Sequence, residues 1–268
     1  TTLTVDQTPP TVDEVTSDAN DGLANPYKVG TTVDIKVSFS EIVDVVPGTN
    51  KPALQLDTDD TPGSVLSEAI YNAGTGSKYP LFRLTVVTNN YSEDLNYRAT
   101  TSLELDGGSI RDAAGNNVTL TLPALDNAKA LKQKKDYWVD GVLPTILTVG
   151  NVITTGDTIV AGHWNFKNSG LVVTVPLETT DASLEGGNIQ LQGRAIGNGA
   201  DGIWDDFGPN PTISSDNVNN AFAEITATKA QFTGLNQFTD GDVVSFRAVV
   251  TDVNENSSTF TASNRQLV

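Results

Sequence analysis

The sequence predicts an all-β protein made of two antiparallel β-sandwiches in tandem, and three observations lead to this fold class. Several short segments alternate apolar and polar residues, which is the pattern of a strand with one buried face. The connections between these segments are rich in Gly, Asn, Asp and Pro, the residues that form turns. Two stretches of sequence also recur in the same order, as expected of a duplicated domain.

The clearest strand runs from Thr31 to Phe39, because every second residue from Val33 onward is apolar. Only Asn127 to Lys135 has a faintly helical pattern. Many short strands separated by turn residues are typical of immunoglobulin-like sandwiches. Similar alternation occurs at Pro80–Val87, Val118–Leu122, Leu171–Val175, Asn188–Leu191, Val243–Val249 and Ser258–Ala262.

The repeated stretches place the domain boundary. Val5–Val12 (VDQTPPTV) returns as Val139–Ile146 (VDGVLPTI), and the turn Asp112–Asn117 returns as Asp252–Asn256. Because both landmarks recur at nearly the same spacing, the sequence predicts one sandwich over residues 1–139 and a second over 140–268.

Composition narrows the classes of function. The chain has no Cys, and a net charge of −17 that repels nucleic acid and anionic membranes and attracts cations. No apolar run approaches the roughly 18 residues that span a bilayer, so membrane insertion by this chain is not expected. The sequence opens with Thr1 in mid-pattern, which favours a piece of a longer protein whose targeting signals lie elsewhere.

Catalytic motifs are missing from the sequence. His163 is the single histidine, it lies in a loop-like stretch, and no nucleophile elbow surrounds it. The Gly-rich stretches lack the Lys that a phosphate-binding loop needs. We therefore expect a protein that is not an enzyme.

Calcium is the cofactor that the acidic residues predict, since Ca²⁺ takes six to eight oxygen ligands from flexible loops. In a sandwich, the start of the first strand, the loop after the second strand and the last loop lie at one end of the domain. All three places hold oxygen side chains in both halves, although the same residue types also form ordinary turns. The predicted ligands are Asp6, Glu41, Asp112 and Asn116 in the first domain, then Asp140, Glu178, Asp181, Asp252, Asn254 and Asn256 in the second, with Asp21 reaching the junction from the first.

The second domain also has a long polar segment, residues 193–220, without a counterpart in the first. Loops of this length in a compact domain are often functional. Trp204, with Asp201 and Asp205 beside it, would stack on a sugar ring or surround a cation. The alternative is a turn in which Trp204 rests on the sheet.

Several segments together resemble the bacterial immunoglobulin-like repeats of large surface adhesins. The resemblance covers nearly all of the first domain but only the two ends of the second. It implies a long, calcium-loaded extracellular stalk assembled from many such modules. The matching segments are Asp6–Pro10, Phe39–Glu41, Leu95–Tyr97, Leu105–Ile110 and Arg111–Asn117.

The expected function is therefore a structural, calcium-stiffened extender of a bacterial surface protein. Its expected partners are neighbouring repeats in the same chain, and it is held at the cell surface by other parts of the parent protein. The alternatives are a module that binds a glycan or a cell-surface protein through residues 193–220, and a subunit of a surface layer.

Overall fold

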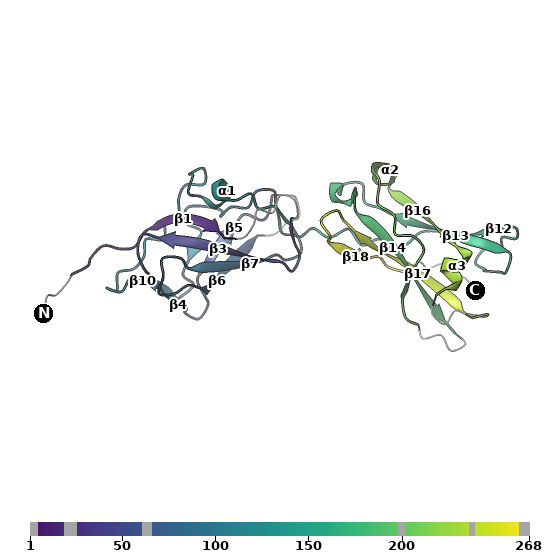
Figure 1. Cartoon of the computed structure of the whole chain (residues 1–268), viewed down its shortest axis with the longest axis horizontal. Helices are drawn as coiled ribbons and strands as arrows, with labels where there is room; N and C mark the ends of the chain where they lie inside the picture. The colour runs from purple at the N-terminus through teal and green to yellow at the C-terminus, as the bar shows by residue number, and fades with distance from the viewer. Residues whose placement is uncertain (1–4, 19–25, 61–65, 198–201, 236–238, 263–268) are drawn as a thin grey trace. The chain divides into compact units, whose positions relative to one another are not determined.

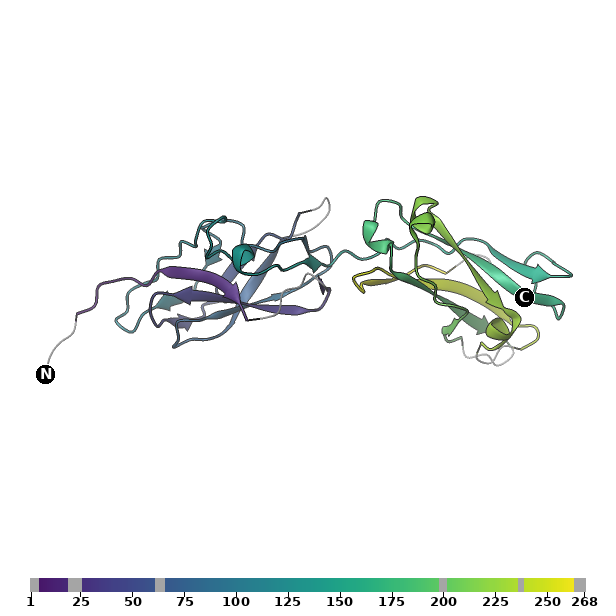
Figure 2. The same ribbon diagram turned by 45° about the horizontal axis from the view of Figure 1, so that its top comes forward.

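The computed structural model describes residues 5–18, 26–60, 66–197, 202–235 and 239–262, which form two compact units, Thr1–Val142 and Leu143–Val268 (Figure 1). Both units are immunoglobulin-like sandwiches built mainly from antiparallel strands, which confirms the predicted fold class. Figure 2 shows the strands of each unit from a second direction.

The first unit contains one six-stranded sheet in the order β1-β3-β7-β6-β5-β9, and two small sheets that close the sandwich. The six strands are β1 (Val12–Ser17), β3 (Thr32–Phe39), β5 (Ala53–Leu56), β6 (Ser67–Ala73), β7 (Leu81–Thr85) and β9 (Leu103–Glu104). The small sheets pair β4 (Asp44–Val46) with β10 (Ser109–Arg111), and β11 (Val139–Asp140) with β2 (Tyr27–Lys28) and β8 (Tyr91–Ser92). Among the described residues of this unit, the one short helix is α1 (Leu131–Lys134).

Strand β3 lies between β1 and β7 and buries one face in the core, as its alternation predicts. Its apolar side chains are buried, with Ile35 and Val37 at 0% exposure, while its polar residues face outward. Burying each such side chain stabilises the fold by roughly 1.5–3 kcal/mol. The register of β3 against β1 and β7 is therefore fixed, because a slip by one residue would expose the whole apolar face.

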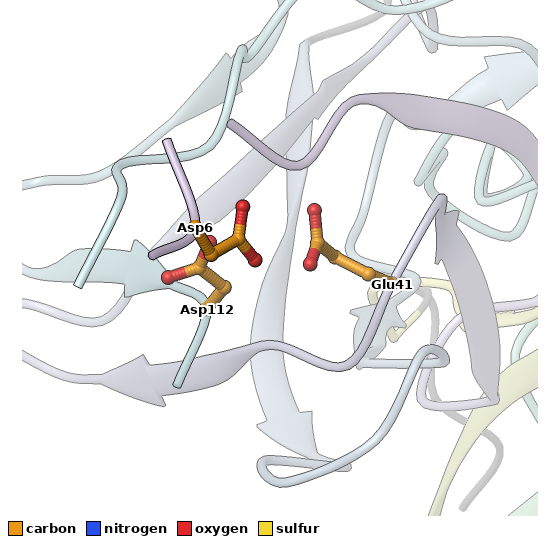
Figure 3. Close-up of side chains that lie close together, drawn as sticks. All are labelled: Asp6, Glu41 and Asp112. Atoms are coloured by element: carbon orange, nitrogen blue, oxygen red, sulfur yellow. The ribbon is translucent and has the colours of Figure 1, made fainter. Parts of the chain in front are cut away.

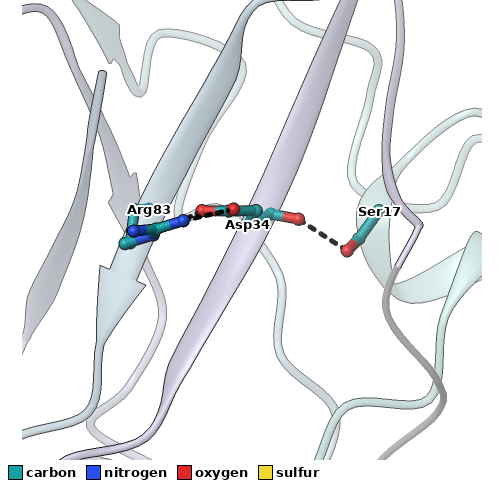
Figure 4. Close-up of polar contacts among 3 residues, drawn as sticks. All are labelled: Ser17, Asp34 and Arg83. Carbon is teal, nitrogen blue, oxygen red and sulfur yellow. Dashed lines mark hydrogen bonds and ion pairs between the residues drawn. The ribbon is translucent and has the colours of Figure 1, made fainter. Parts of the chain in front are cut away.

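Polar contacts on β3 tie it to both neighbouring strands (Figure 4). The guanidinium of Arg83 on β7 donates two hydrogen bonds to the Asp34 carboxylate, both 2.7 Å long. The hydroxyl of Ser17 on β1 donates to the backbone carbonyl of Asp34 at 2.6 Å. The three strands are thus joined at one level by side chains as well as by the backbone.

The second unit packs a three-stranded sheet, β12-β13-β16, against a four-stranded sheet, β15-β14-β17-β18. The strands are β12 (Val152–Gly156), β13 (Asn168–Pro176), β14 (Asn188–Ile196), β15 (Asp205–Phe207), β16 (Phe222–Thr228), β17 (Val243–Thr251) and β18 (Ser257–Thr259). Short helical turns connect them: η1 (Ala182–Leu184), α2 (Ser215–Asn219) and α3 (Lys229–Thr233).

Aromatic rings dominate the second core. Phe232 lies 5.9 Å from Phe246 and 6.2 Å from Phe207, measured between ring centroids. Trp164 covers Phe232 from outside at 4.6 Å. Helix α3 brings Phe232 into the core and is started by a capping box at Thr228 and Gln231.

The structure differs from the sequence predictions in two segments. Val118–Leu122 alternates correctly, but it is not a strand, because Asn117 and Thr119 form only isolated bridges. Residues 193–220 are not one loop: β14 continues to Ile196, β15 pairs with it as a hairpin, and α2 follows. No helix in the described part of the chain has the length and apolar character needed to cross a membrane.

Candidate metal centre

Three carboxylates from distant parts of the first unit come together at one end of its sandwich (Figure 3). Asp6 precedes β1, Glu41 follows β3, and Asp112 follows β10. Each offers a carboxylate oxygen, and these oxygens lie within 4.8 Å of one another. Among the described residues this is the one group of acidic or histidine side chains with the spacing of metal ligands.

A tight turn from Asp112 to Asn116 orients the Asp112 carboxylate. The Asp112 carboxylate accepts the backbone N–H of Asn116 at 2.8 Å and the Asn116 side-chain amide at 2.7 Å. Gly115 has a φ of +94°, a left-handed conformation that glycine adopts without steric cost. This turn was predicted to be a loop that carries metal ligands. In the structure, Asn116 donates hydrogen bonds to the Asp112 carboxylate and so holds it in place.

The same turn recurs in the second unit with the same hydrogen bonds. The carboxylate of Asp252 accepts the backbone N–H of Asn256 at 2.8 Å and its side-chain amide at 3.1 Å. Glu255 has a positive φ of 65° at the position of Gly115. Asp252, Asn254 and Asn256 are all buried. The sequence repeat is therefore a repeat of local structure.

Backbone contacts hold the segment that bears Asp6 against the other two carboxylates. Thr11 donates its backbone N–H to the Ser40 hydroxyl at 3.0 Å, directly before Glu41. The side-chain amide of Asn116 donates to the backbone carbonyl of Asp6 at 3.3 Å. Thr119 donates its backbone N–H to the carbonyl of Pro10 at 2.8 Å. The site is thus built by the fold rather than by one loop.

The electrostatics of this group favour a cation. Burial alone would raise the pKa of Asp112, but hydrogen bonds from the Asn116 side chain and from backbone N–H groups of the turn lower it overall. Asp112 therefore carries its negative charge at neutral pH beside two further carboxylates. Like charges at this separation repel, and a divalent cation between them replaces the repulsion with attraction.

The predicted ligands of the loop after β13 are engaged in turns of their own. Glu178 accepts the backbone N–H of Thr179 at 3.0 Å, and Asp181 caps the short helix η1 by accepting the backbone N–H of Ser183 at 3.0 Å. This loop does lie beside the Asp252 turn, since Val253 donates to the Ser183 carbonyl at 2.9 Å. The loops meet as expected, and both carboxylates accept hydrogen bonds from residues of their own loop.

Asp140 is not a free linker residue, contrary to expectation. It lies in β11 of the first unit, is 1% exposed, and accepts the backbone N–H of Val142 at 2.9 Å. The division between units falls after Val142, slightly beyond the predicted boundary at residue 139. Asp21 lies outside the described residues. A junction site that combines Asp140 with Asp252 stays a prediction from the sequence.

A second group of acidic residues in the first unit has a different character. The pKa of Asp57 is raised by burial, by a hydrogen bond with Asp59, and by the charge of Asp60. These groups do not meet the spacing of metal ligands within the described part of the chain. The raised pKa means that Asp57 binds a proton more readily than an ordinary aspartate.

Trp204 lies on the outward face of the four-stranded sheet and is half-buried. Two guanidinium groups lie over its ring, that of Arg247 at 4.4 Å and that of Arg194 at 4.7 Å from the ring centroid. Asp205 begins strand β15, and Asp201 lies outside the described residues. Neither arginine was predicted from the sequence, although each occupies an outward position in an alternating strand.

No protein-family model matches the chain, and no curated protein matches it either. Among solved structures, a chain of a cytokine receptor complex is 11% identical, over 89% of this chain and 92% of that chain, with a TM-score of 0.28. The Enterococcus faecalis MSCRAMM ACE is 11% identical, over 96% of this chain and 94% of its own, with a TM-score of 0.17. Scores this low support no statement about function.

Proposed function

We propose that this chain is a structural, calcium-stiffened extender module of a long extracellular bacterial surface protein, and that it is not an enzyme. The observation behind the proposal is the meeting of Asp6, Glu41 and Asp112 at one end of the first sandwich. Their positions before β1, after β3 and after β10 mean that one cation would join three separate parts of the domain.

Calcium fits these residues better than other common cations. All three side chains are carboxylates, which suit hard cations, whereas zinc and copper sites use His or Cys. The ligands come from irregular segments, and Ca²⁺ tolerates irregular geometry where Mg²⁺ demands a near-ideal octahedron. Backbone carbonyls and water would complete the coordination.

The proposed role is mechanical. The segment before β1 is extended, and without a ligand only a few hydrogen bonds attach it to the sandwich. A cation held by Asp6 on this segment and by Glu41 and Asp112 on the body would fix the direction in which the chain meets the domain. Repetition of such joints gives a stiff rod from short modules.

The test is a comparison of wild type and Glu41→Gln by calorimetry, each in excess calcium and in chelator. Wild type should be stabilised by calcium, by about 2.7 kcal/mol at a hundredfold excess over the dissociation constant. Glu41→Gln should lose most of this gain. In chelator it should be at least as stable as wild type, because one source of repulsion is removed.

Glu68→Gln serves as the matched control, since Glu68 is an exposed carboxylate on β6. It removes the same charge away from the site and should keep the full response to calcium. If the midpoints of wild type in calcium and in chelator coincide, the metal proposal fails.

A further inference from the structure

The outward face of the second unit's four-stranded sheet holds two arginines around one tryptophan. Arg194 on β14 and Arg247 on β17 place their guanidinium groups 4.7 Å and 4.4 Å from the centroid of the Trp204 ring. The strands are paired so that Gln192 lies opposite Arg247, which makes Arg194 a diagonal neighbour of Arg247 on the same face. All three side chains are half-buried.

Neither guanidinium has a carboxylate at ion-pair distance within the described part of the chain. The Nε of Arg247 donates to the Gln192 side chain at 2.7 Å, and the Gln192 amide donates to the Asp206 carboxylate at 2.8 Å. The Nε of Arg194 is buried and has no hydrogen-bond partner. In a chain with 33 acidic and 16 basic residues, two neighbouring arginines without a carboxylate at ion-pair distance are unexpected.

The arrangement concentrates positive charge in a strongly negative molecule. Burial lowers the pKa of Arg247 and the charge of Arg194 lowers it further, while the charge of Asp206 opposes them. The Trp204 ring offsets part of the repulsion, because the negative face of an indole attracts cations. A guanidinium has five N–H donors, and the contacts with Trp204 and Gln192 do not use all of them. The remaining donors have a geometry that suits an oxyanion.

We propose that Arg194, Arg247 and Trp204 bind the carboxylate of an acidic saccharide of the uronic-acid type, with Gln192 and Asp206 beside them. The guanidinium groups would hold the carboxylate, and the exposed carboxylate of Asp206 would accept sugar hydroxyls. The Trp204 ring lies under both guanidinium groups and would hold them in place for the carboxylate.

The mixture of charges at this patch favours a sugar with isolated carboxylates. A densely anionic ligand, such as a sulfated polysaccharide or an acidic peptide, would place further negative charge against Asp206. A neutral sugar would leave the guanidinium donors unmatched. A uronic acid has one carboxylate for the arginines and hydroxyls for the acceptor.

The experiment is isothermal titration of the full chain with a short oligogalacturonide, in chelator so that the outcome does not depend on calcium. Wild type should bind, and the double variant Arg194→Gln/Arg247→Gln should bind at least about tenfold more weakly. The more conservative Arg194→Lys/Arg247→Lys keeps the charge but loses bidentate donation, and should fall between the two.

Lys167→Gln/Lys229→Gln is the matched control, because it removes the same charge from exposed lysines of the same unit. It should bind within about twofold of wild type, and thermal melting confirms that each variant is folded. A heparin-derived oligosaccharide and a maltooligosaccharide of the same length test the sulfated and neutral alternatives. The proposal is overturned if wild type does not bind the uronate, if it prefers either alternative, or if the lysine control loses as much binding.

Discussion

At the scale of single residues, the Asp34–Arg83 pair links the stability of the first unit to pH. The hydrogen bonds and charge of Arg83 lower the pKa of Asp34 below its usual 3.8. A carboxylate with a lowered folded-state pKa stabilises the fold at pH values above its unfolded pKa. This contribution is lost as the pH falls through the lowered folded-state value. The pair is partly exposed, with side-chain exposures of 44% for Arg83 and 34% for Asp34, so solvent weakens it.

We predict that Asp34→Asn lowers the stability of the full chain at pH 7 by about 0.5 kcal/mol, the value typical of an exposed ion pair. The difference from wild type should shrink as the pH falls below 3.8, the usual pKa of this group. Urea unfolding across the acid range measures both effects. Asp13→Asn, on the exposed side of β1, is the control. A constant difference at every pH would contradict the assignment.

At the scale of elements, the Asp–Asn turn of the first unit has a glycine at its left-handed position, where the turn of the second unit has Glu255. Gly115 holds a φ of +94° between two hydrogen-bonded ends of the turn. We predict that Gly115→Ala destabilises the first unit by roughly 1–2 kcal/mol, the cost of a left-handed conformation for a residue with a Cβ. Gly115→Asn should recover most of the loss, since Asn tolerates this conformation. Calorimetry of the full chain measures both variants; equal melting points would show that the turn can relax.

Elements with a strong local pattern could be predicted from the sequence, and the others depended on contacts distant in sequence. The alternation of Thr31–Phe39 was sufficient to predict β3, because burial on one face dictates it. Val118–Leu122 alternates equally well, yet its neighbours offer only isolated bridges. The hairpin of β14 and β15 was missed because short polar stretches such as Asp205–Phe207 form strands only when a partner edge is available.

The residues of the candidate sites also divide into those that could be predicted from the sequence and those that could not. Asp6, Glu41 and Asp112 could be brought together from strand directions alone, since each adjoins a strand whose course the fold class dictates. Asp140 was misplaced because its burial in β11 depends on pairing with β2 and β8, which the sequence does not reveal. Arg194 and Arg247 were overlooked because their proximity comes from the register of two strands far apart in the chain.

At the scale of the whole molecule, the proposed extender role predicts that calcium stiffens the chain. We expect small-angle scattering of the full chain to give a narrow distribution of maximum dimension in calcium and a broader one in chelator. Glu68→Gln, the control of the calorimetric test, should leave both profiles unchanged. Superimposable wild-type profiles in calcium and in chelator would mean that the metal does not stiffen the chain.

The position of Asp6 ahead of β1 has a consequence for how the first unit bears tension. A pull on the chain from its N-terminal side reaches Asp6 before it reaches the β1–β3 ladder. In the proposed calcium-bound form, the load would pass through the ion to Glu41 at the end of β3 and to Asp112 after β10. Strand β1 would then be relieved of the full load, and the force at which the sandwich opens would be set by metal–carboxylate bonds. The same domain would yield more easily wherever calcium is scarce.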